Sequence, residues 1–246
     1  AYYNLNANGN PPWGGGSGVG NGNETTAQAR YPSALASGDY PYAIWNEYTG
    51  LGVGYGGQLY WTYDQTGWDV GSFMYPEMVD LLWNDFKDLW LASPSLMYNE
   101  DEGQYNAVVS SQDWTRSNNY YFRTEAITDD GYMVFGEEQI VIDEQTCLTP
   151  GDASGSYNTA PKISTGDNGF GVMGIIGFFP GAADGASDIS NYHLPIFKIT
   201  EDYGQSWHGP SGDPADACDF YSVPDDVLDD MIANFPVQTY VDVCGG

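Results

Sequence analysis

Short strand-like runs separated by turn-forming residues are the feature that most restricts the fold of this chain. From residue 29 onward, segments rich in β-branched and aromatic side chains alternate with Gly, Asn, Asp and Pro. The runs are RYPSALAS (30–37), YPYAIWNE (40–47), GGQLYWTYD (56–64), QYNAVVSSQDW (104–114), NYYFRTEAI (119–127), YMVFGEEQIVID (132–143), GFGVMGIIGFF (169–179) and HLPIFKIT (193–200). This alternation predicts antiparallel strands joined by tight turns, and therefore an all-β fold.

Two segments depart from the strand pattern because their apolar residues recur at helical spacing. We expect short helical insertions at 77–91 and 224–236, the second with Pro224, Asp225 and Asp226 at its positive end. Each helix is expected to cover a sheet edge or pack between repeats, and docking of a partner is the alternative. The apolar positions are Met78, Val79, Leu82, Trp83, Phe86, Leu89 and Trp90, then Val227, Leu228, Met231, Ile232 and Phe235.

The charge and composition limit the class of partner. The formal net charge is -28 at pH 7, from 34 acidic residues against six Lys and Arg residues. Nucleic acids and anionic membrane surfaces reward cationic patches, so neither is expected as a partner. Abundant Gly and Tyr with little Lys is typical of β-rich extracellular proteins. A chain that begins with Ala1 also fits a removed secretion signal, and no apolar run of about 18 residues predicts membrane insertion.

The chain has three cysteines, which cannot all pair within one chain. Cys218 and Cys244 flank a short segment and are the candidate disulfide. Cys147 is then a leftover thiol or has a partner elsewhere. No cysteine and histidine cluster has the spacing of a zinc site.

One turn carries a compact motif. Residues 200–207 read Thr-Glu-Asp-Tyr-Gly-Gln-Ser-Trp and fit the pattern Ser/Thr-x-Asp-x-Gly-x-Ser/Thr-Trp. Two degenerate copies lie earlier in the chain, each after a strand-like run. The residues concerned are Thr200, Asp202, Gly204, Ser206 and Trp207, then Thr62, Asp64, Gly67 and Trp68, and finally Thr128, Asp129 and Gly131.

This motif resembles the Asp box of sialidase-like β-propellers of bacterial secreted and surface proteins. Locally, the carboxylate of Asp202 can accept bonds from turn N–H groups, Gly204 can take a positive φ, and Trp207 can pack between sheets. The Asp is therefore expected to be structural rather than catalytic.

The resemblance implies antiparallel β-propeller blades, about three of them in residues 29–210, from a six- or seven-bladed ring. Residues 1–28 are expected to be a Gly- and Asn-rich arm or linker, and residues 211–246 a Cys-containing segment with a short helix. Three blades would leave an open edge. Further blades of a longer parent protein are the favoured completion, and another chain is the alternative.

The resemblance also raises the question of catalysis. Sialidases hold their substrate carboxylate with three arginines from different blades, and Arg30, in Arg30-Tyr31-Pro32, resembles the first of them. The chain has three arginines in total, and Arg116 and Arg123 are close in sequence. Salt bridges to carboxylates are therefore the favoured interpretation, and Arg30 is a weak catalytic candidate only.

Calcium is the one cofactor that the acidic loops suggest, because Ca²⁺ prefers carboxylate and carbonyl oxygens. The candidate ligands are Asp101, Asp130 and Asp216. No loop matches the EF-hand pattern, and solvated acidic loops without metal are an equal alternative.

The expected function is therefore that of a secreted or cell-surface module acting in surface structure, adhesion or assembly. A glycan-binding module is the first alternative, because aromatic side chains stack on sugar faces. A glycoside hydrolase of the sialidase type is the second.

Overall fold

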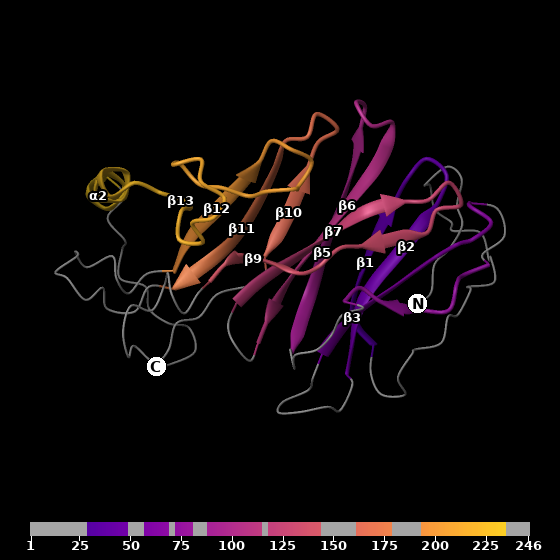
Figure 1. Ribbon diagram of the computed structural model, residues 1–246. Helices are drawn as coiled ribbons and strands as arrows, with labels where there is room; N and C mark the ends of the chain where they lie inside the picture. Colours follow the sequence, from indigo (N-terminus) through magenta and orange to yellow (C-terminus); the bar gives the residue numbers. More distant parts are fainter. Residues whose placement is uncertain are drawn as a thin grey trace.

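The computed structural model describes residues 29–48, 57–68, 72–80, 88–114, 118–143, 161–178 and 193–234. In these residues the expectation of an all-β fold is confirmed, since the strands form three antiparallel sheets (Figure 1). The described strands do not close into a barrel or ring. None of the described helical residues forms a stretch long and apolar enough to cross a membrane.

The three sheets repeat one connectivity, in which consecutive strands are neighbours. Sheet 1 contains β1 (Ala29–Ala36), β2 (Pro41–Tyr48), β3 (Gly57–Tyr63) and β4 (Glu77–Met78). Sheet 2 contains β5 (Leu89–Asn99), β6 (Gln104–Asp113), β7 (Asn118–Ile127) and β8 (Met133–Phe135), and β9 (Gln139–Ile142) also pairs with β7. Sheet 3 contains β10 (Lys162–Thr165), β11 (Gly171–Phe178), β12 (His193–Thr200) and β13 (Tyr221–Ser222). Helix α2 (Asp225–Asn234) follows β13.

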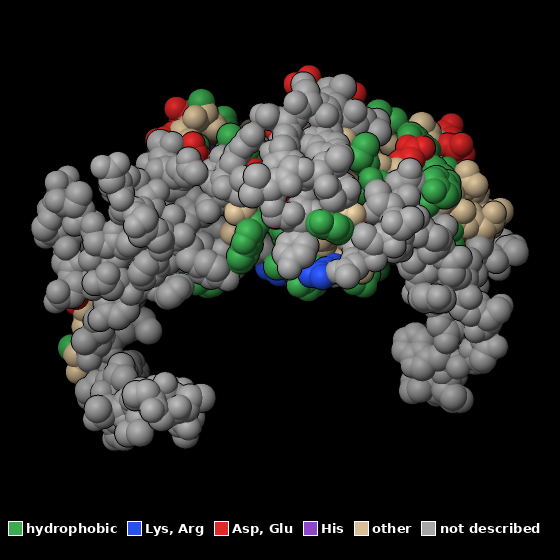
Figure 2. Space-filling model, turned by 90° about the horizontal axis from the view of Figure 1, so that it is seen from below, with side chains coloured by type: hydrophobic (Ala, Val, Ile, Leu, Met, Phe, Trp, Pro, Cys, Tyr) green, Lys and Arg blue, Asp and Glu red, His purple; other side chains and the backbone are tan. Residues whose placement is uncertain are grey.

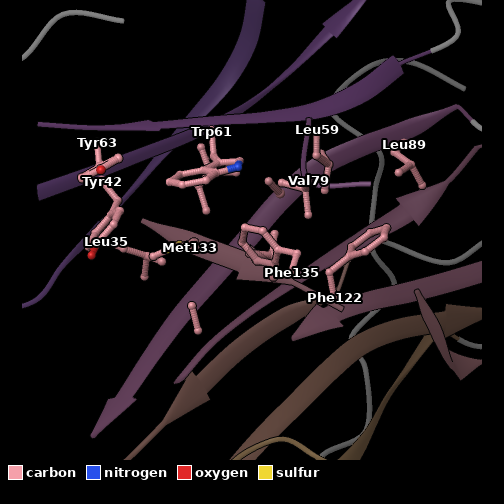
Figure 3. Close-up of a cluster of buried hydrophobic side chains, with 14 of the residues drawn as sticks. Leu35, Tyr42, Leu59, Trp61, Tyr63, Val79, Leu89, Phe122, Met133 and Phe135 are labelled. Carbon is pink, nitrogen blue, oxygen red and sulfur yellow. The ribbon is translucent and has the colours of Figure 1, made fainter. Parts of the chain in front are cut away.

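Sheet 2 lies between the other two sheets and is buried on both faces. Because side chains alternate along a strand, Val109 and Phe122 face sheet 1, whereas Val108 and Tyr121 face sheet 3. Figure 3 shows the first of these cores, between sheets 1 and 2. Its members include Leu35, Tyr42, Ile44, Leu59, Trp61 and Tyr63 from sheet 1 and Leu89, Ala107, Val109, Tyr120, Phe122, Met133 and Phe135 from sheet 2. The second core contains Met97, Val108, Tyr121, Val141, Ile142, Met173, Ile175, Ile196 and Trp207.

The first strands of the three sheets lie side by side, since β5 contacts both β1 and β10. Ser33 Oγ donates to the carbonyl of Ala92 at 2.9 Å, which joins β1 to β5. Ser95 Oγ lies 2.7 Å from Thr165 Oγ1, which joins β5 to β10. The sheets therefore fan out from a shared line of edge strands.

The same irregularity occurs in the first strand of two sheets. The β1–β2 register shifts between Arg30 and Ser33, and the β5–β6 register shifts between Trp90 and Ser93. In each case one extra residue is inserted, and it lies beside a non-glycine residue of positive φ, Tyr31 at 52° or Leu91 at 57°. Matching bulges at matching positions support an internal repeat.

The helix predicted at 77–91 is wrong where it can be compared. Glu77–Met78 is β4, paired with β3, and Leu89 starts β5, paired with β6. Val79 and Leu89 are buried in the core between sheets 1 and 2, so packing and strand pairing override the helical spacing. Residues 81–87 lie outside the described residues. The second predicted helix is confirmed as α2 (Asp225–Asn234).

Candidate functional site

The turn after the third strand of each sheet forms one end of the molecule, here called the turn end. In sheet 3 it is the motif at 200–207. Thr200 Oγ1 donates to Asp202 Oδ1 at 2.7 Å and accepts from Gly204 N at 2.9 Å. Ser206 N and Ser206 Oγ donate to the two carboxylate oxygens of Asp202 at 2.9 and 2.5 Å. Among the described residues, the carboxylate of Asp202 thus accepts hydrogen bonds only from those of its own turn.

These hydrogen bonds determine the ionisation of Asp202. Burial alone would raise its pKa, but hydrogen bonds from Ser206, Thr200 and Gln205 outweigh burial and lower the pKa below its usual value. Asp202 is therefore a carboxylate at neutral pH, which suits an acceptor of N–H and O–H groups rather than a proton donor.

The same turn is fitted against sheet 2. Tyr203 and Gly204 both have positive φ, 59° and 77°. A Cβ on Gly204 would lie 2.5 Å from Val108 Cγ2, so only glycine fits there. Trp207 is 3% exposed within the second core, and Arg123 Nε donates to the carbonyl of Tyr203 at 2.9 Å. Gly204 and Trp207 thus allow sheet 3 to pack closely against sheet 2.

The first degenerate copy makes a similar turn in sheet 1. Asp64, fully buried, accepts from Thr66 N at 3.0 Å, Thr66 Oγ1 at 2.7 Å and Ser72 N at 3.0 Å. Gly67 has a φ of 75°. Trp68, however, is 44% exposed and does not repeat the packing of its counterpart in sheet 3. Thr62, also predicted, donates from Oγ1 to the carbonyl of Met74 at 2.6 Å.

The second copy uses a different aspartate from the one predicted. The hydroxyl of Thr128 donates to the carboxylate of Asp130, whereas the backbone carbonyl of Asp129 accepts from Tyr40 Oη at 3.1 Å. Thr-x-Asp is therefore common to the three turns in sequence, and a hydrogen bond from this Thr to this Asp is common to the second and third turns. Gly131, at φ 88°, leaves no room for a Cβ, which would lie 2.6 Å from the ring of Tyr40.

An aromatic side chain fastens this second turn to sheet 1. Tyr132 packs edge-on against Trp61, with ring centroids 5.2 Å apart, and its hydroxyl donates to the carboxylate of Glu77. That hydrogen bond, together with burial, raises the pKa of Tyr132 to about 12. Each turn of sheets 2 and 3 thus packs against the preceding sheet.

The three candidate calcium ligands lie apart, each in its own local turn. Asp101 is exposed, and its backbone N–H donates to Asn99 Oδ1 at 3.0 Å. Asp130 is bound by Thr128, as described above. Asp216 Oδ1 accepts from Cys218 N at 2.8 Å. The described residues contain no group of three or more His, Cys, Asp or Glu side chains that could hold a metal ion.

A lysine occupies the loop in which Asp216 was the calcium candidate. Lys198 is 1% exposed, and its Nζ donates to the carbonyl of Asp216 at 2.8 Å. Burial lowers the pKa of Lys198, while the nearby carboxylates of Asp219 and Asp216 oppose that change. This ammonium group supplies a positive charge inside an acidic loop, where the calcium hypothesis would have placed a metal.

The opposite end of the sheets, here called the loop end, carries a different set of polar groups. Asn46 is 1% exposed and Gln58 and Asn119 are fully buried. Asn46 Oδ1 and both amide atoms of Gln58 and Asn119 find no hydrogen-bond partner among the described residues. Buried polar groups are normally paired, so three such amides at one end require an explanation.

Two buried carboxylates accompany these amides. Asp88 Oδ1 accepts from Gly57 N at 2.7 Å, which ties the start of sheet 2 to sheet 1. The backbone N–H of Asp88 donates to Asp113 Oδ1 at 3.1 Å. Both side chains are almost fully buried, at 2% and 0% exposed. The loop end therefore combines carboxylates and amides in its interior.

The bulges bring aromatic and cationic groups to the same end. Arg30, the predicted catalytic candidate, pairs with Asn46 across β1 and β2, and its guanidinium carbon lies 5.6 Å from the centroid of the Trp90 ring. Tyr31 is 47% exposed and meets Trp90 edge-on at 5.9 Å. In Figure 2, Lys and Arg side chains lie beside hydrophobic ones at the lower edge of the central part of the molecule, and most of the visible Asp and Glu side chains lie along its upper and right-hand edges.

The described arginines are not brought together. Arg123 lies between sheets 2 and 3, where it donates to Tyr203 O and to Asn106 Oδ1. Arg30 lies at the loop end, whereas the contact of Arg123 is with the turn end. Arg116 is outside the described residues. An arginine cluster for a carboxylate is thus not formed by the described residues.

The cysteine prediction is only partly open to comparison. Cys218 is disulfide-bonded. Both other cysteines, Cys147 and Cys244, lie outside the described residues, as does the predicted arm at 1–28. Pairing of Cys218 with Cys244 therefore stays a prediction.

Searches of protein-family models, curated proteins and solved structures find no match for this chain.

Sequence reasoning missed Gln58, Asn119 and Asp88 at the loop end. The sequence did contain a signal for a further buried polar residue, Asn46. This residue continues the two-residue spacing of Tyr42 and Ile44, which are buried, and so occupies a core-facing position.

Proposed function

We propose that this chain is part of an Asp-box β-propeller in a secreted or cell-surface protein, where it acts in adhesion by recognition rather than by catalysis. The proposal is supported by three sheets of one connectivity and by a turn after the third strand of each, in which the sequence Thr-x-Asp recurs and the aspartate accepts from a Thr hydroxyl. The matching bulges of β1 and β5 add a further repeated feature. Sheets outside the described residues would complete the ring.

The recognition surface in this proposal is the loop end, and its ligand is a glycan. The observation that carries it is the aromatic surface of Tyr31 and Trp90 beside the guanidinium of Arg30, with Tyr31 47% exposed. Sugar rings offer an apolar face that stacks on aromatic rings and hydroxyl groups that pair with amides and carboxylates. Tyr31 and Trp90 would supply the stacking contact, and the guanidinium of Arg30 the polar contact.

Recognition is favoured over hydrolysis by the positions of the cations. Hydrolysis of sialosides by a sialidase-type mechanism needs several arginines around one carboxylate. Arg30 lies at the loop end, whereas Arg123 lies between sheets 2 and 3 and already donates to three acceptors there. The hydrolase alternative therefore has no support from the described residues.

A glycan array with the whole chain tests the proposal. We expect binding to a restricted set of glycans, and Tyr31→Ala should weaken it roughly tenfold. Tyr75→Ala is the matched control, because Tyr75 is 64% exposed but lies outside the loop-end cluster. Absence of binding to any glycan, or equal loss in both variants, would contradict the proposal.

A further inference from the structure

The outer face of sheet 3 is the sheet face turned away from sheet 2. Met173, Ile175 and Ile196 point into the second core, so the residues between them in sequence point outward. No other sheet of the described residues packs on this face. It consists of Lys162, Ser164, Val172, Gly174, Ile176, Pro195, Phe197, Ile199 and Tyr221.

This face is apolar and partly open to solvent. Ile176 is 38% exposed and Phe197 is 36% exposed. Phe197 stacks on Tyr221, with ring centroids 5.1 Å apart and planes at 12°. Large exposed apolar side chains gathered on one surface mark interaction sites more often than chance.

The charge pattern separates this face from the rest of the chain. None of its residues is acidic, although the chain has 34 acidic residues. Its one charged residue is Lys162, exposed on β10 at one margin. At the other margin, β13 leads into α2, which carries exposed Asp226, Asp229 and Asp230 and lies beyond sheet 3 in Figure 1.

The outer face of sheet 1 differs, because it is already buried. Trp45 is 2% exposed, Tyr60 is 4% exposed, and Glu47 and Gln58 are fully buried. It is therefore not available to receive sheet 3 of another molecule. Among the described sheet faces, the outer face of sheet 3 is the one open to association.

We propose that the outer face of sheet 3 binds the same face of a second copy of this chain. The contacts in a two-fold interface are reciprocal. If the β10 margin of one copy contacts the α2 margin of the second copy, the β10 margin of the second copy contacts the α2 margin of the first. Lys162 of each copy then meets the acidic α2 margin of the other. Two chains of charge -28 repel each other, and a face without carboxylates is where they can approach.

This inference goes beyond glycan recognition, because it concerns a surface on a different sheet from the loop-end site. It also differs from completion by further sheets of a longer parent protein, which would cover the same face. The dimer and a ring closed by further sheets therefore compete for this face, so a dimer formed through it would exclude ring closure at sheet 3. Glycan binding at the loop end does not require the dimer, and failure of the dimer leaves the glycan proposal intact.

Sedimentation equilibrium of the whole chain over a wide concentration range is the test. We expect a reversible dimer of a 26.8 kDa chain. Phe197→Asp should weaken dimerisation roughly a hundredfold, and the milder Ile176→Ser should weaken it roughly tenfold. Ile140→Asp is the control, because Ile140 is 47% exposed on sheet 2 and should leave the dimer unchanged. Far-UV circular dichroism confirms that each variant is folded.

Charge reversal tests the pairing of the margins. Lys162→Glu should weaken the dimer roughly three- to tenfold, and adding Asp229→Lys should restore part of the loss. A monomer at every concentration, or a dimer indifferent to Phe197→Asp and Ile176→Ser, would overturn the proposal. A monomeric chain that associates only when extended by further sheets would assign the face to a longer parent instead.

Discussion

The turn end and the loop end are formed by the same strands, but they differ in whether their buried aspartates and amides are hydrogen-bonded. At the turn end, Asp64 and Asp202 each accept several hydrogen bonds from their own turn. At the loop end, Gln58 and Asn119 are buried without partners among the described residues. The carboxylates of the turn end are thus satisfied within their own turns, whereas the unpaired amides of the loop end carry an energetic cost that folding alone does not explain.

The turn end and the loop end also differ in which residue types adopt positive φ angles. Positive φ at the turn end is carried mainly by glycine, as at Gly67, Gly131 and Gly204, whereas at the loop end it falls on Tyr31 and Leu91. A side chain at positive φ costs on the order of 1 kcal/mol or more and persists where other interactions hold it. The turns thus place most of their positive φ angles on residues that adopt them at little cost, whereas the bulges place theirs on Tyr31 and Leu91, beside the aromatic surface of the loop end.

The largest expected effect distinguishes two tryptophans of the repeated turns. Trp207→Ala should lower the free energy of unfolding by about 3–5 kcal/mol, because a buried aromatic leaves a cavity between sheets 2 and 3. Trp68→Ala should cost less than about 1 kcal/mol, since Trp68 is 44% exposed. Urea unfolding of both variants measures the difference. Equal losses would mean that the first turn packs as tightly as the third.

The next effect concerns the glycines of the turn end. Gly204→Ala should lower the free energy of unfolding by about 2–4 kcal/mol, because it adds strain at positive φ and a clash with Val108. Gly103→Ala is the control, with a φ of 65° and no atom within 4 Å of an added Cβ. It should cost only about 1 kcal/mol of backbone strain. Thermal unfolding compares the two, and similar losses would count against the close fit of Gly204.

The parts that the sequence predicted well are those whose contacts are local. The bonds of Thr200, Asp202 and Ser206 all fall within one turn, so a motif of eight residues contains the information needed. The second turn was harder, because Asp129 and Asp130 are adjacent and only geometry shows that Thr128 bonds to Asp130. The resemblance to propellers extended this local success to a ring that the described sheets do not close.

The parts that failed depend on contacts distant in sequence. Helical spacing at 77–91 was outweighed by pairing with β3 and β6. The loop-end site was not predicted because Gly57 meets Asp88 only when sheets 1 and 2 pack together. A polar residue in a strand is predicted to lie at the surface unless it is known that both faces of its sheet are covered.

Acid should weaken the turn end through Asp202. Its pKa is lowered in the folded protein, so its contribution to stability is present above the unfolded pKa, about 4, and is lost as the pH falls through the folded value. Asp202→Asn should therefore cost about 1–2 kcal/mol near neutral pH and progressively less below roughly pH 4. Asp129→Asn is the control, because only its backbone carbonyl is bonded to Tyr40. Urea unfolding from pH 3 to 7 measures both, and a constant difference would contradict the assignment.

The smallest effect has the opposite sign and bears directly on the loop end. Gln58→Met replaces a fully buried amide, unpaired among the described residues, by a side chain of similar shape. It should leave the free energy of unfolding unchanged or raise it by up to about 1 kcal/mol, because an unpaired polar group no longer has to be desolvated. Thr124→Val is the control among paired groups, since Thr124 Oγ1 accepts from Ala107 N at 2.9 Å. It should cost about 1–2 kcal/mol.

The two variants together decide what the unpaired amides are for. If Gln58→Met is neutral or stabilising, the amide contributes little to folding, and the contrast between the hydrogen-bonded aspartates of the turn end and the unpaired amides of the loop end holds. If Gln58→Met is as costly as Thr124→Val, then Gln58 has a partner in solution and the contrast between the two ends is smaller than the buried atoms indicate. In that case the aromatic and cationic surface of Arg30, Tyr31 and Trp90 would have to carry recognition without buried amides beside it.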